Sequence, residues 1–112
     1  MTISDVQNIL NAKVISGQDH LENEVHNACG SDMMSDVLAF VKDQSVLLTG
    51  LVNPQVVRTA DMMDMVCNVF VRGKEPSQEI IDLACDRGIV LMKTPLRMFP
   101  ACGMLYEAGL RG

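Results

Sequence analysis

Ten polar and glycine residues supply the chemistry that this sequence offers. They are Ser31, Asp32, Ser35, Asp36, Thr49, Gly50, Asn53, Arg72, Gly73 and Thr94. Most of them follow a predicted strand, and in an open parallel sheet ligands gather at the carboxyl ends of the strands, where helix N-termini also point. With the bases Lys74, Lys93 and Arg97 nearby, they predict a binding site for a small anion such as a phosphate. The alternative, that the glycines are turn residues and the others are helix caps, stays open.

Two of these residues also suggest an enzymatic hypothesis. Asp32 and Asp36 lie one helical turn apart and would act as the base of a small transferase or hydrolase, with Ser31 or Ser35 as nucleophile or positioning group. Such chemistry requires a closed pocket around the carboxylates. The alternative is a solvated helix start, where the helix dipole favours acidic residues. No catalytic residue is therefore predicted.

Motifs of the common enzyme and metal sites do not occur. Gly73-Lys74 is followed by Glu75 and lacks the earlier glycine of a P-loop, and the dinucleotide, hydrolase-elbow and zincin motifs are absent. The four cysteines form no C-x-x-C pair, so we expect reduced thiols and neither a metal nor a cofactor. His20 and His26 stand among acidic residues, which is more typical of surface histidines than of a metal site.

Three β-rich runs alternate with X-Pro steps through the second part of the chain. The expected strands are 45–49, 67–71 and 89–93, and the steps are Asn53-Pro54, Glu75-Pro76 and Thr94-Pro95. Proline suits the first turn of a helix, so each step is expected to begin one. The expected helices cover 54–65, 76–87 and, because Pro100 would break a helix that began at Pro95, a segment from Phe99 to before Gly109.

The first part of the chain completes the predicted sheet. Its expected elements are a helix at Ile3–Leu10, strands at Lys13–Ser16 and Glu24–Cys29, and a helix at Met33–Val41 capped by Ser31 or Asp32. Consecutive strand–helix units require parallel strands joined by right-handed crossovers. The predicted fold is therefore a single α/β domain over residues 1–112, with about five mostly parallel strands flanked by helices.

Composition excludes several classes of protein. The chain has 112 residues, 48% of them hydrophobic, and a formal net charge of −5 that lies wholly in residues 1–43. Nine basic residues scattered along an acidic chain do not form the cationic surface that nucleic-acid binding needs. The apolar runs are too short to span a bilayer, and the first residues lack a secretory signal, so we expect a cytoplasmic protein.

Adjacent methionines indicate a surface for a partner. In Met33-Met34 and Met62-Met63, one residue of each pair turns away from the core, because neighbouring helical side chains point in different directions. Methionine adapts to irregular contact surfaces. A homodimer is therefore expected, and a loosely specified monomer core is the alternative.

Five segments in order along the chain carry a family likeness. They are residues 29–38 (CGSDMMSDVL), 46–50 (VLLTG), 69–77 (VFVRGKEPS), 88–96 (GIVLMKTPL) and 103–110 (GMLYEAGL). Together they resemble the DRTGG domain, and especially its free-standing single-domain members, with S-D-x-x-S-D-V and T-P-L as the more specific pieces. Of the motif that names the family only Gly73 is clearly present, so no role of its Asp and Arg is carried over. Ser31, Asp32, Ser35 and Asp36 match the free-standing members.

The resemblance implies a small α/β domain, usually dimeric, that carries no catalytic residues. The family recurs as an accessory module of pyrophosphatases with CBS domains and of some phosphate acetyltransferases, and it is similar to the non-catalytic N-terminal domain of HPr kinase. We therefore expect a homodimeric regulatory or interaction module, a candidate sensor of a small phosphate- or nucleotide-containing anion. A structural subunit bound to a protein partner is the remaining alternative, beside the small enzyme.

Overall fold

The chain contains five α-helices and five strands, and helices and strands alternate from Asn27 onward. A computed structural model describes residues 1–112. The elements are α1 (Ile3–Leu10), β1 (Lys13–Ser16), the short 3-10 helix η1 (Gln18–His20), β2 (Asn27–Gly30), α2 (Met34–Phe40), β3 (Ser45–Thr49), α3 (Pro54–Met62), β4 (Cys67–Phe70), α4 (Gln78–Arg87), β5 (Val90–Lys93) and α5 (Met98–Glu107). The expected order of helices and strands is confirmed.

The strands form one sheet in the order β1-β5-β4-β3-β2. Strands β2 to β5 run parallel, and β1 pairs antiparallel with β5 at one edge. Parallel neighbours need a crossover connection, and α2, α3 and α4 supply the three crossovers. The predicted α/β fold with five mostly parallel strands is confirmed.

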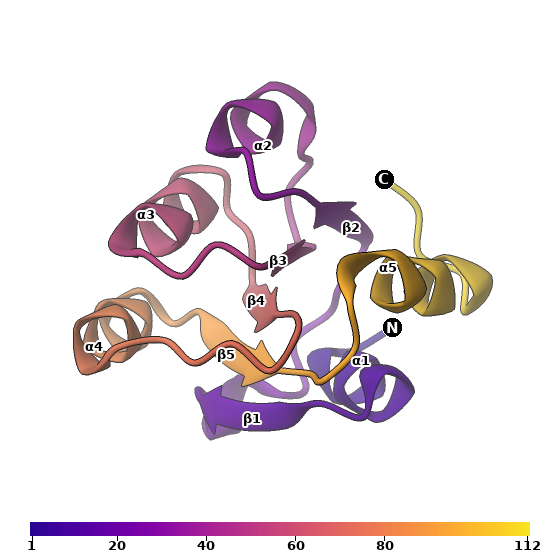
Figure 1. Cartoon of the computed structure of the whole chain (residues 1–112), viewed down its shortest axis with the longest axis horizontal. Helices are drawn as coiled ribbons and strands as arrows, with labels where there is room; N and C mark the ends of the chain where they lie inside the picture. The colour runs from indigo at the N-terminus through magenta and orange to yellow at the C-terminus, as the bar shows by residue number, and fades with distance from the viewer.

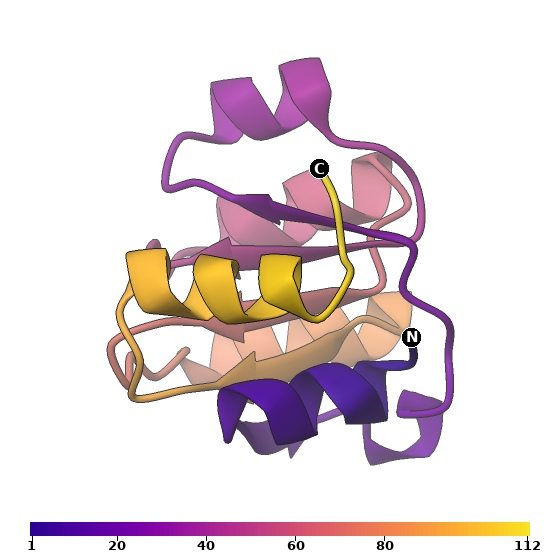
Figure 2. The ribbon, with the colours of Figure 1, turned by 90° about the vertical axis from the view of Figure 1, so that its right-hand side faces the viewer.

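The helices lie in two layers around the sheet. Each crossover moves one strand further in the same direction, and crossovers are right-handed, so α2, α3 and α4 share one face. The first and last helices, α1 and α5, cover the opposite face and pack against each other. Figure 1 shows α2, α3 and α4 on one side of the sheet and α1 and α5 on the other, and Figure 2 shows α1 and α5 in front of the strands.

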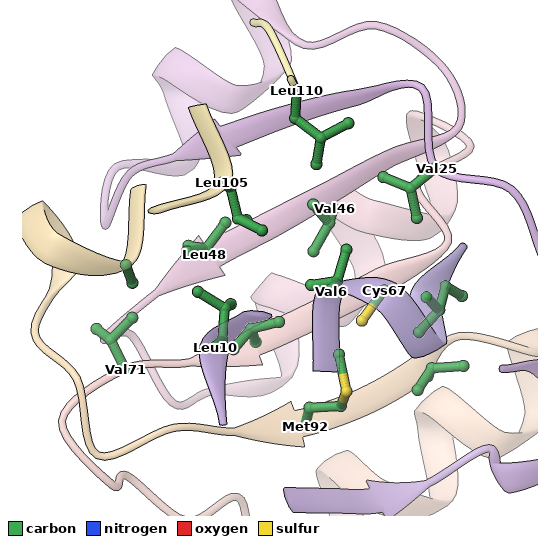
Figure 3. Packing of buried hydrophobic residues seen from close by; sticks show 14 residues of the cluster. Val6, Leu10, Val25, Val46, Leu48, Cys67, Val71, Met92, Leu105 and Leu110 are labelled. Carbon is green, nitrogen blue, oxygen red and sulfur yellow. The ribbon is translucent and has the colours of Figure 1, made fainter. Parts of the chain in front are cut away.

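The two layers enclose two apolar clusters, because successive strand residues point to opposite faces. In β3, Val46 and Leu48 face α1 and α5, whereas Leu47 between them faces α2, α3 and α4. Figure 3 shows Val6 of α1 and Leu105 of α5 packed on the first of these faces. A strand buried on both faces carries apolar residues on both, which explains the continuous apolar run 46–48 that predicted β3.

Two element boundaries lie three residues from their predicted positions. Strand β2 begins at Asn27 and not at Glu24, because the segment before it bonds elsewhere: Val25 N–H donates to Met1 O at 2.7 Å and His26 N–H to Gln44 O at 2.8 Å. Helix α3 ends at Met62, three residues early, and the turn that follows holds Asp64 at a positive φ of 54°.

Two prolines behave differently from the prediction. Helix α4 begins at Gln78 and is capped by the Ser77 hydroxyl, so Pro76 lies before the helix and not in its first turn. Helix α5 begins at Met98 and takes Pro100 as its third residue. The first-turn N–H groups of a helix have no partner within it, so Pro100 breaks nothing there. Asn53 caps α3 with Pro54 at its first position, as predicted.

No helix of the chain combines the length and the apolar character needed to cross a membrane.

Candidate functional site

Four parallel strands end at the same edge of the sheet, on the left in Figure 2, and the predicted site residues lie in the loops there. Ser31 and Asp32 follow β2, Thr49 and Gly50 end and follow β3, and Arg72 follows β4. Ser31 N–H donates to Leu48 O at 3.0 Å and so continues the β2–β3 ladder by one residue. This ladder brings Asp32 beside the end of β3.

Asp32 is bonded to the end of β3. Its Oδ1 accepts from Gly50 N–H at 2.6 Å and from Thr49 Oγ1 at 3.1 Å. Thr49 and Gly50 are buried, whereas Asp32 is exposed. The carboxylate therefore satisfies the backbone amide of Gly50.

The predicted cap of α2 is wrong as stated. The N-cap residue is Met33, and it makes no side-chain capping bond. Ser31 Oγ instead accepts from Met33 N–H at 3.0 Å, one residue before the helix begins. The Asp32 side chain does not cap the helix because it accepts from Gly50 N–H. A carboxylate that accepts a buried N–H makes a stronger bond than it would at the solvent-exposed start of a helix.

The Arg72 side chain lies against Gly50. A Cβ added at Gly50 would overlap Arg72 Nη2, so a larger residue there would displace the guanidinium. The Arg72 backbone has a positive φ of 59°, and its N–H donates to Leu96 O at 2.8 Å, which fixes where the side chain leaves the loop. The structure thus brings Asp32, Thr49, Gly50 and Arg72 together, so that a guanidinium and a carboxylate lie at the ends of neighbouring strands.

Gly73 and Thr94 connect the ends of β4 and β5. Gly73 has a positive φ of 64°, which glycine adopts without strain, and its N–H donates to Thr94 O at 2.8 Å. The Thr94 side chain is fully buried, and its hydroxyl donates to Leu10 O at 2.8 Å at the end of α1. Thr94 therefore holds the loop in place and offers no surface to a ligand.

The remaining predicted residues stand apart from this cluster. Asn53 Oδ1 accepts from Gln55 N–H at 3.0 Å and serves as the cap of α3. Ser35 and Asp36 are exposed on α2, and their side chains make no hydrogen bond within the chain. Asp32 and Asp36 line none of the three cavities, so the structure provides no closed pocket for the enzymatic hypothesis.

The basic residues at this edge differ in whether they form an ion pair. Lys93 forms an ion pair with Glu75, and this hydrogen bond and charge hold the pKa of the Glu75 carboxyl below its usual value. Arg72, Lys74 and Arg97 are exposed and make no ion pair. Three uncommitted cations in loops after β4 and β5 therefore set the positive character of the edge.

None of the three cavities is lined by Asp32, Thr49, Gly50 or Arg72. One of about 210 Å³ lies between β2, α5 and the C-terminal residues, one of about 340 Å³ between α3 and α4, and one of about 360 Å³ beside η1. The cluster around Arg72 is thus an open surface site. No group of three or more His, Cys, Asp or Glu residues is arranged to hold a metal ion.

The cysteines are free thiols. Burial raises the pKa of the Cys29, Cys67 and Cys102 thiols, and the neighbouring Cys102 contributes to the shift at Cys29. Cys85 on α4 is the exposed one. Three of the four thiols are therefore poor nucleophiles at neutral pH, as expected of small apolar residues.

The sequence did not predict the hydrogen bonds that join Asp32 to the end of β3. The hydrogen bonds of Asp32 to Thr49 and Gly50 join residues 17 and 18 positions apart, and no local pattern reports such a pair. The only available signal was that Asp32 precedes a short helix while Gly50 follows a buried strand that is parallel to the strand before Asp32.

No protein-family model matches the chain, and no curated protein matches it. Among solved structures, the chain is similar to a crystal structure of the CBS and DRTGG domains of the regulatory region of Clostridium perfringens pyrophosphatase, complexed with its activator diadenosine tetraphosphate. The TM-score is 0.73 at 17% sequence identity, and the match covers 93% of this chain and 45% of that chain, so this chain corresponds to less than half of the other. This likeness confirms the expected DRTGG-like α/β fold.

Proposed function

We propose that residues 1–112 form one non-catalytic regulatory module, a homodimer, that senses a small phosphate- or nucleotide-containing anion at the carboxyl ends of its strands. The observation that carries this proposal is the Arg72 guanidinium, which lies against Gly50 and has no acidic partner. Guanidinium groups match the oxygens of a phosphate with two parallel hydrogen bonds. An unpaired arginine beside a buried backbone amide is a suitable anchor for such a ligand.

Asp32 supplies the sensing step of the proposal. The phosphate of the ligand binds Arg72 and competes with the Asp32 carboxylate for Gly50 N–H, now bonded at 2.6 Å. The phosphate and the Asp32 carboxylate repel each other at this donor, so binding releases Asp32 together with the segment that leads into α2. Loss of this link frees a seven-residue helix whose exposed side chains include Leu38 and Phe40. The ligand signal is thereby passed to a surface that a protein partner contacts.

The shared fold supports a regulatory role and guides the choice of ligand. The similar structure is a regulatory region, and its activator is a dinucleoside polyphosphate. Polyphosphates present several anionic oxygens, which suits an edge that carries Arg72 and Lys74 as free cations. Nucleotides are therefore the first ligands to test.

Exposed apolar side chains support the dimer. Met33, Phe40, Met62, Phe99 and Tyr106 are each at least 60% exposed. Such side chains gather where a protein surface meets a partner. The same observation supports a partner protein, which would bind whichever of these surfaces the dimer leaves open.

The proposal is tested by thermal unfolding with inorganic phosphate, ATP and diadenosine tetraphosphate. A ligand at one hundred times its Kd stabilises a protein by about 2.7 kcal/mol, which corresponds to a rise in Tm of roughly 10 °C for a chain of this size. The rise is expected in the unmodified chain and in Arg58→Ala, which removes an exposed arginine of α3 away from the edge. Arg72→Ala should abolish it. An equal rise in Arg72→Ala, or no rise with any of the three compounds, contradicts the proposed site.

A further inference from the structure

Helix α5 carries an apolar outer face. Phe99 and Tyr106 are 89% and 60% exposed, and Pro100, Gly103 and Met104 are exposed beside them. Phe99, Gly103 and Tyr106 follow i, i+4, i+7 spacing, so they form one stripe along the helix. No charged residue occurs from Met98 to Tyr106, and a helix that is apolar all round is normally buried. Figure 2 shows α5 on the outside of the molecule, with no other segment in front of it.

Gly103 has no role within the folded chain that requires glycine. It lies in the middle of α5 without a positive φ, and a Cβ added there would meet nothing within 4 Å. Glycine in a helix interior is destabilising relative to alanine. Between two exposed aromatic side chains, it instead leaves a notch that lets another backbone or a ring approach closely.

Arg97 and Glu107 stand at the unfavourable ends of the α5 dipole, whereas Arg111 Nη1 donates to Tyr106 O at the C-terminal end of the helix. Arg97 is the N-cap residue and Glu107 is the last helical residue, and no side chain caps the first turn. A cation is unfavourable at a helix N-terminus and an anion at its C-terminus. Neither side chain has an ion-pair partner in the chain.

We infer that α5 packs antiparallel against α5 of a second copy of this chain, around a twofold axis at Cys102 and Gly103. Positions 97 and 107 are centred on position 102, so Glu107 of each copy comes to the uncapped, Arg97 end of the other helix. Positions 99 and 106 are centred between 102 and 103, so each Phe99 faces Tyr106 of the other copy across the glycine notch. One operation thus satisfies the reversed charges, the apolar stripe and the glycine together.

The two exposed rings supply part of the area of an ordinary dimer interface. An aromatic side chain buries about 150–250 Å², so the exposed parts of Phe99 and Tyr106 offer about 300 Å² per copy. A standard interface buries about 800 Å² per partner. The two rings would form its centre, and the neighbouring cavity of about 210 Å³, which Cys102 and Tyr106 line, extends it toward β2. Arg111, stacked 3.9 Å from the Tyr106 ring centre, lies at the rim.

Helix α2 is the rival surface, since Phe40 is 76% exposed. In a symmetric α2 pair, however, the exposed Asp36 carboxylates of the two copies would approach each other with the same charge. We assign α2 to the signalling surface and α5 to the dimer. This inference rests on the homodimer of the proposed function and names its interface.

Disulfide trapping tests the twofold axis directly. The variant Gly103→Cys is made in a chain without exposed Cys85 and without Cys102 (Cys85→Ser, Cys102→Ala), and it is oxidised with copper phenanthroline. A residue at a twofold axis meets its own copy, so we expect a covalent dimer on a non-reducing gel. The control Glu79→Cys, exposed on α4, should give none. Equal trapping at both positions, or trapping only at position 79, overturns the inference.

Sedimentation velocity of two matched variants supplies the second readout. Phe99→Ser and Phe40→Ser each remove one strongly exposed ring, so neither should change folding, which circular dichroism confirms. In a twofold dimer each substitution changes the interface in both copies. Phe99→Ser is therefore expected to raise the dimer Kd by roughly a hundredfold or more, and Phe40→Ser to leave it unchanged. The reverse result overturns this interface and keeps the dimer of the proposed function. An unmodified chain that stays monomeric at all concentrations overturns both, and leaves anion sensing at Arg72 standing.

Discussion

Replacing Asp32 with alanine is predicted to destabilise the free protein and to strengthen its binding of phosphate. The carboxylate accepts two hydrogen bonds, from Gly50 N–H at 2.6 Å and from Thr49 Oγ1 at 3.1 Å. Both donors belong to buried residues, so alanine leaves an N–H and a hydroxyl without this partner. The same change frees the amide that the proposed ligand needs.

The magnitude follows from the character of these bonds. A hydrogen bond to a charged group contributes about 1.5–3 kcal/mol, and the exposure of Asp32 places its loss toward the lower end, at about 2 kcal/mol in all. For a chain of this length that corresponds to a fall in Tm of roughly 8 °C. Removing a negative charge beside a bound phosphate favours the complex by about 1 kcal/mol, or fivefold in Kd.

The matched control is Asp36→Ala, four residues away. Asp36 is also exposed, but its side chain makes no hydrogen bond, so its loss should change stability by less than about 0.5 kcal/mol. Differential scanning calorimetry measures both variants, and isothermal titration with ATP measures the affinity. Equal losses of Tm in the two variants, or an unchanged or weaker affinity in Asp32→Ala, would refute the competition between Asp32 and the ligand.

Three further predictions concern the rest of the chain. The Asn68 side chain is fully buried in β4, and neither of its polar atoms has a hydrogen-bond partner. Asn68→Leu should therefore raise the free energy of unfolding, measured with urea, by about 1–2 kcal/mol. A decrease would show that the amide makes a stabilising interaction. The Thr2 backbone N–H, which donates to Asp5 Oδ2 at 2.9 Å, and to a lesser extent the Thr2 hydroxyl hold the pKa of the Asp5 carboxyl low. This contribution to stability is present above the ordinary pKa of aspartate and is lost as the pH falls through the lowered one. An NMR titration should give Asp5 a pKa below that of a free aspartate, and an ordinary value would contradict the capping box. Of the thiols, Cys85 should react first with a maleimide at pH 7.5 and Cys67 only on unfolding; mass spectrometry of the labelled peptides would show any other order.

Local patterns were sufficient to predict most of the fold. The apolar runs at 45–49 and 89–93 became buried strands, and Asn53-Pro54 became a capped helix start, because burial on two faces and an N-terminal proline leave clear local patterns. The predicted start of β2 was wrong because Val25 is as apolar as a strand residue, yet its N–H donates to Met1 O and not to a neighbouring strand. Long-range hydrogen bonds thus determine where β2 begins, and composition does not report them.

The site was predictable as a set of positions but not as a set of contacts. Topology alone brings Asp32, Gly50 and Arg72 to one edge, since parallel strands end on the same side. Whether each side chain is free or engaged depends on details of the loops. The Thr94 hydroxyl donates a hydrogen bond to Leu10 O, and the Asp32 carboxylate accepts one from Gly50 N–H, whereas Arg72 has no ion-pair partner. Residue type alone predicts none of these three results.

The most direct test of anion sensing at the strand ends is an NMR titration of the ¹⁵N-labelled chain with ATP. If the account is right, the amide signals of Asp32, Gly50, Arg72 and Gly73 shift together with one Kd, and the signals of the cavity residues Gly17, His20 and Gly88 stay in place. The account is contradicted if no signal shifts at millimolar ATP, or if the shifts gather around Gly17 and His20 while Gly50 and Arg72 are unchanged.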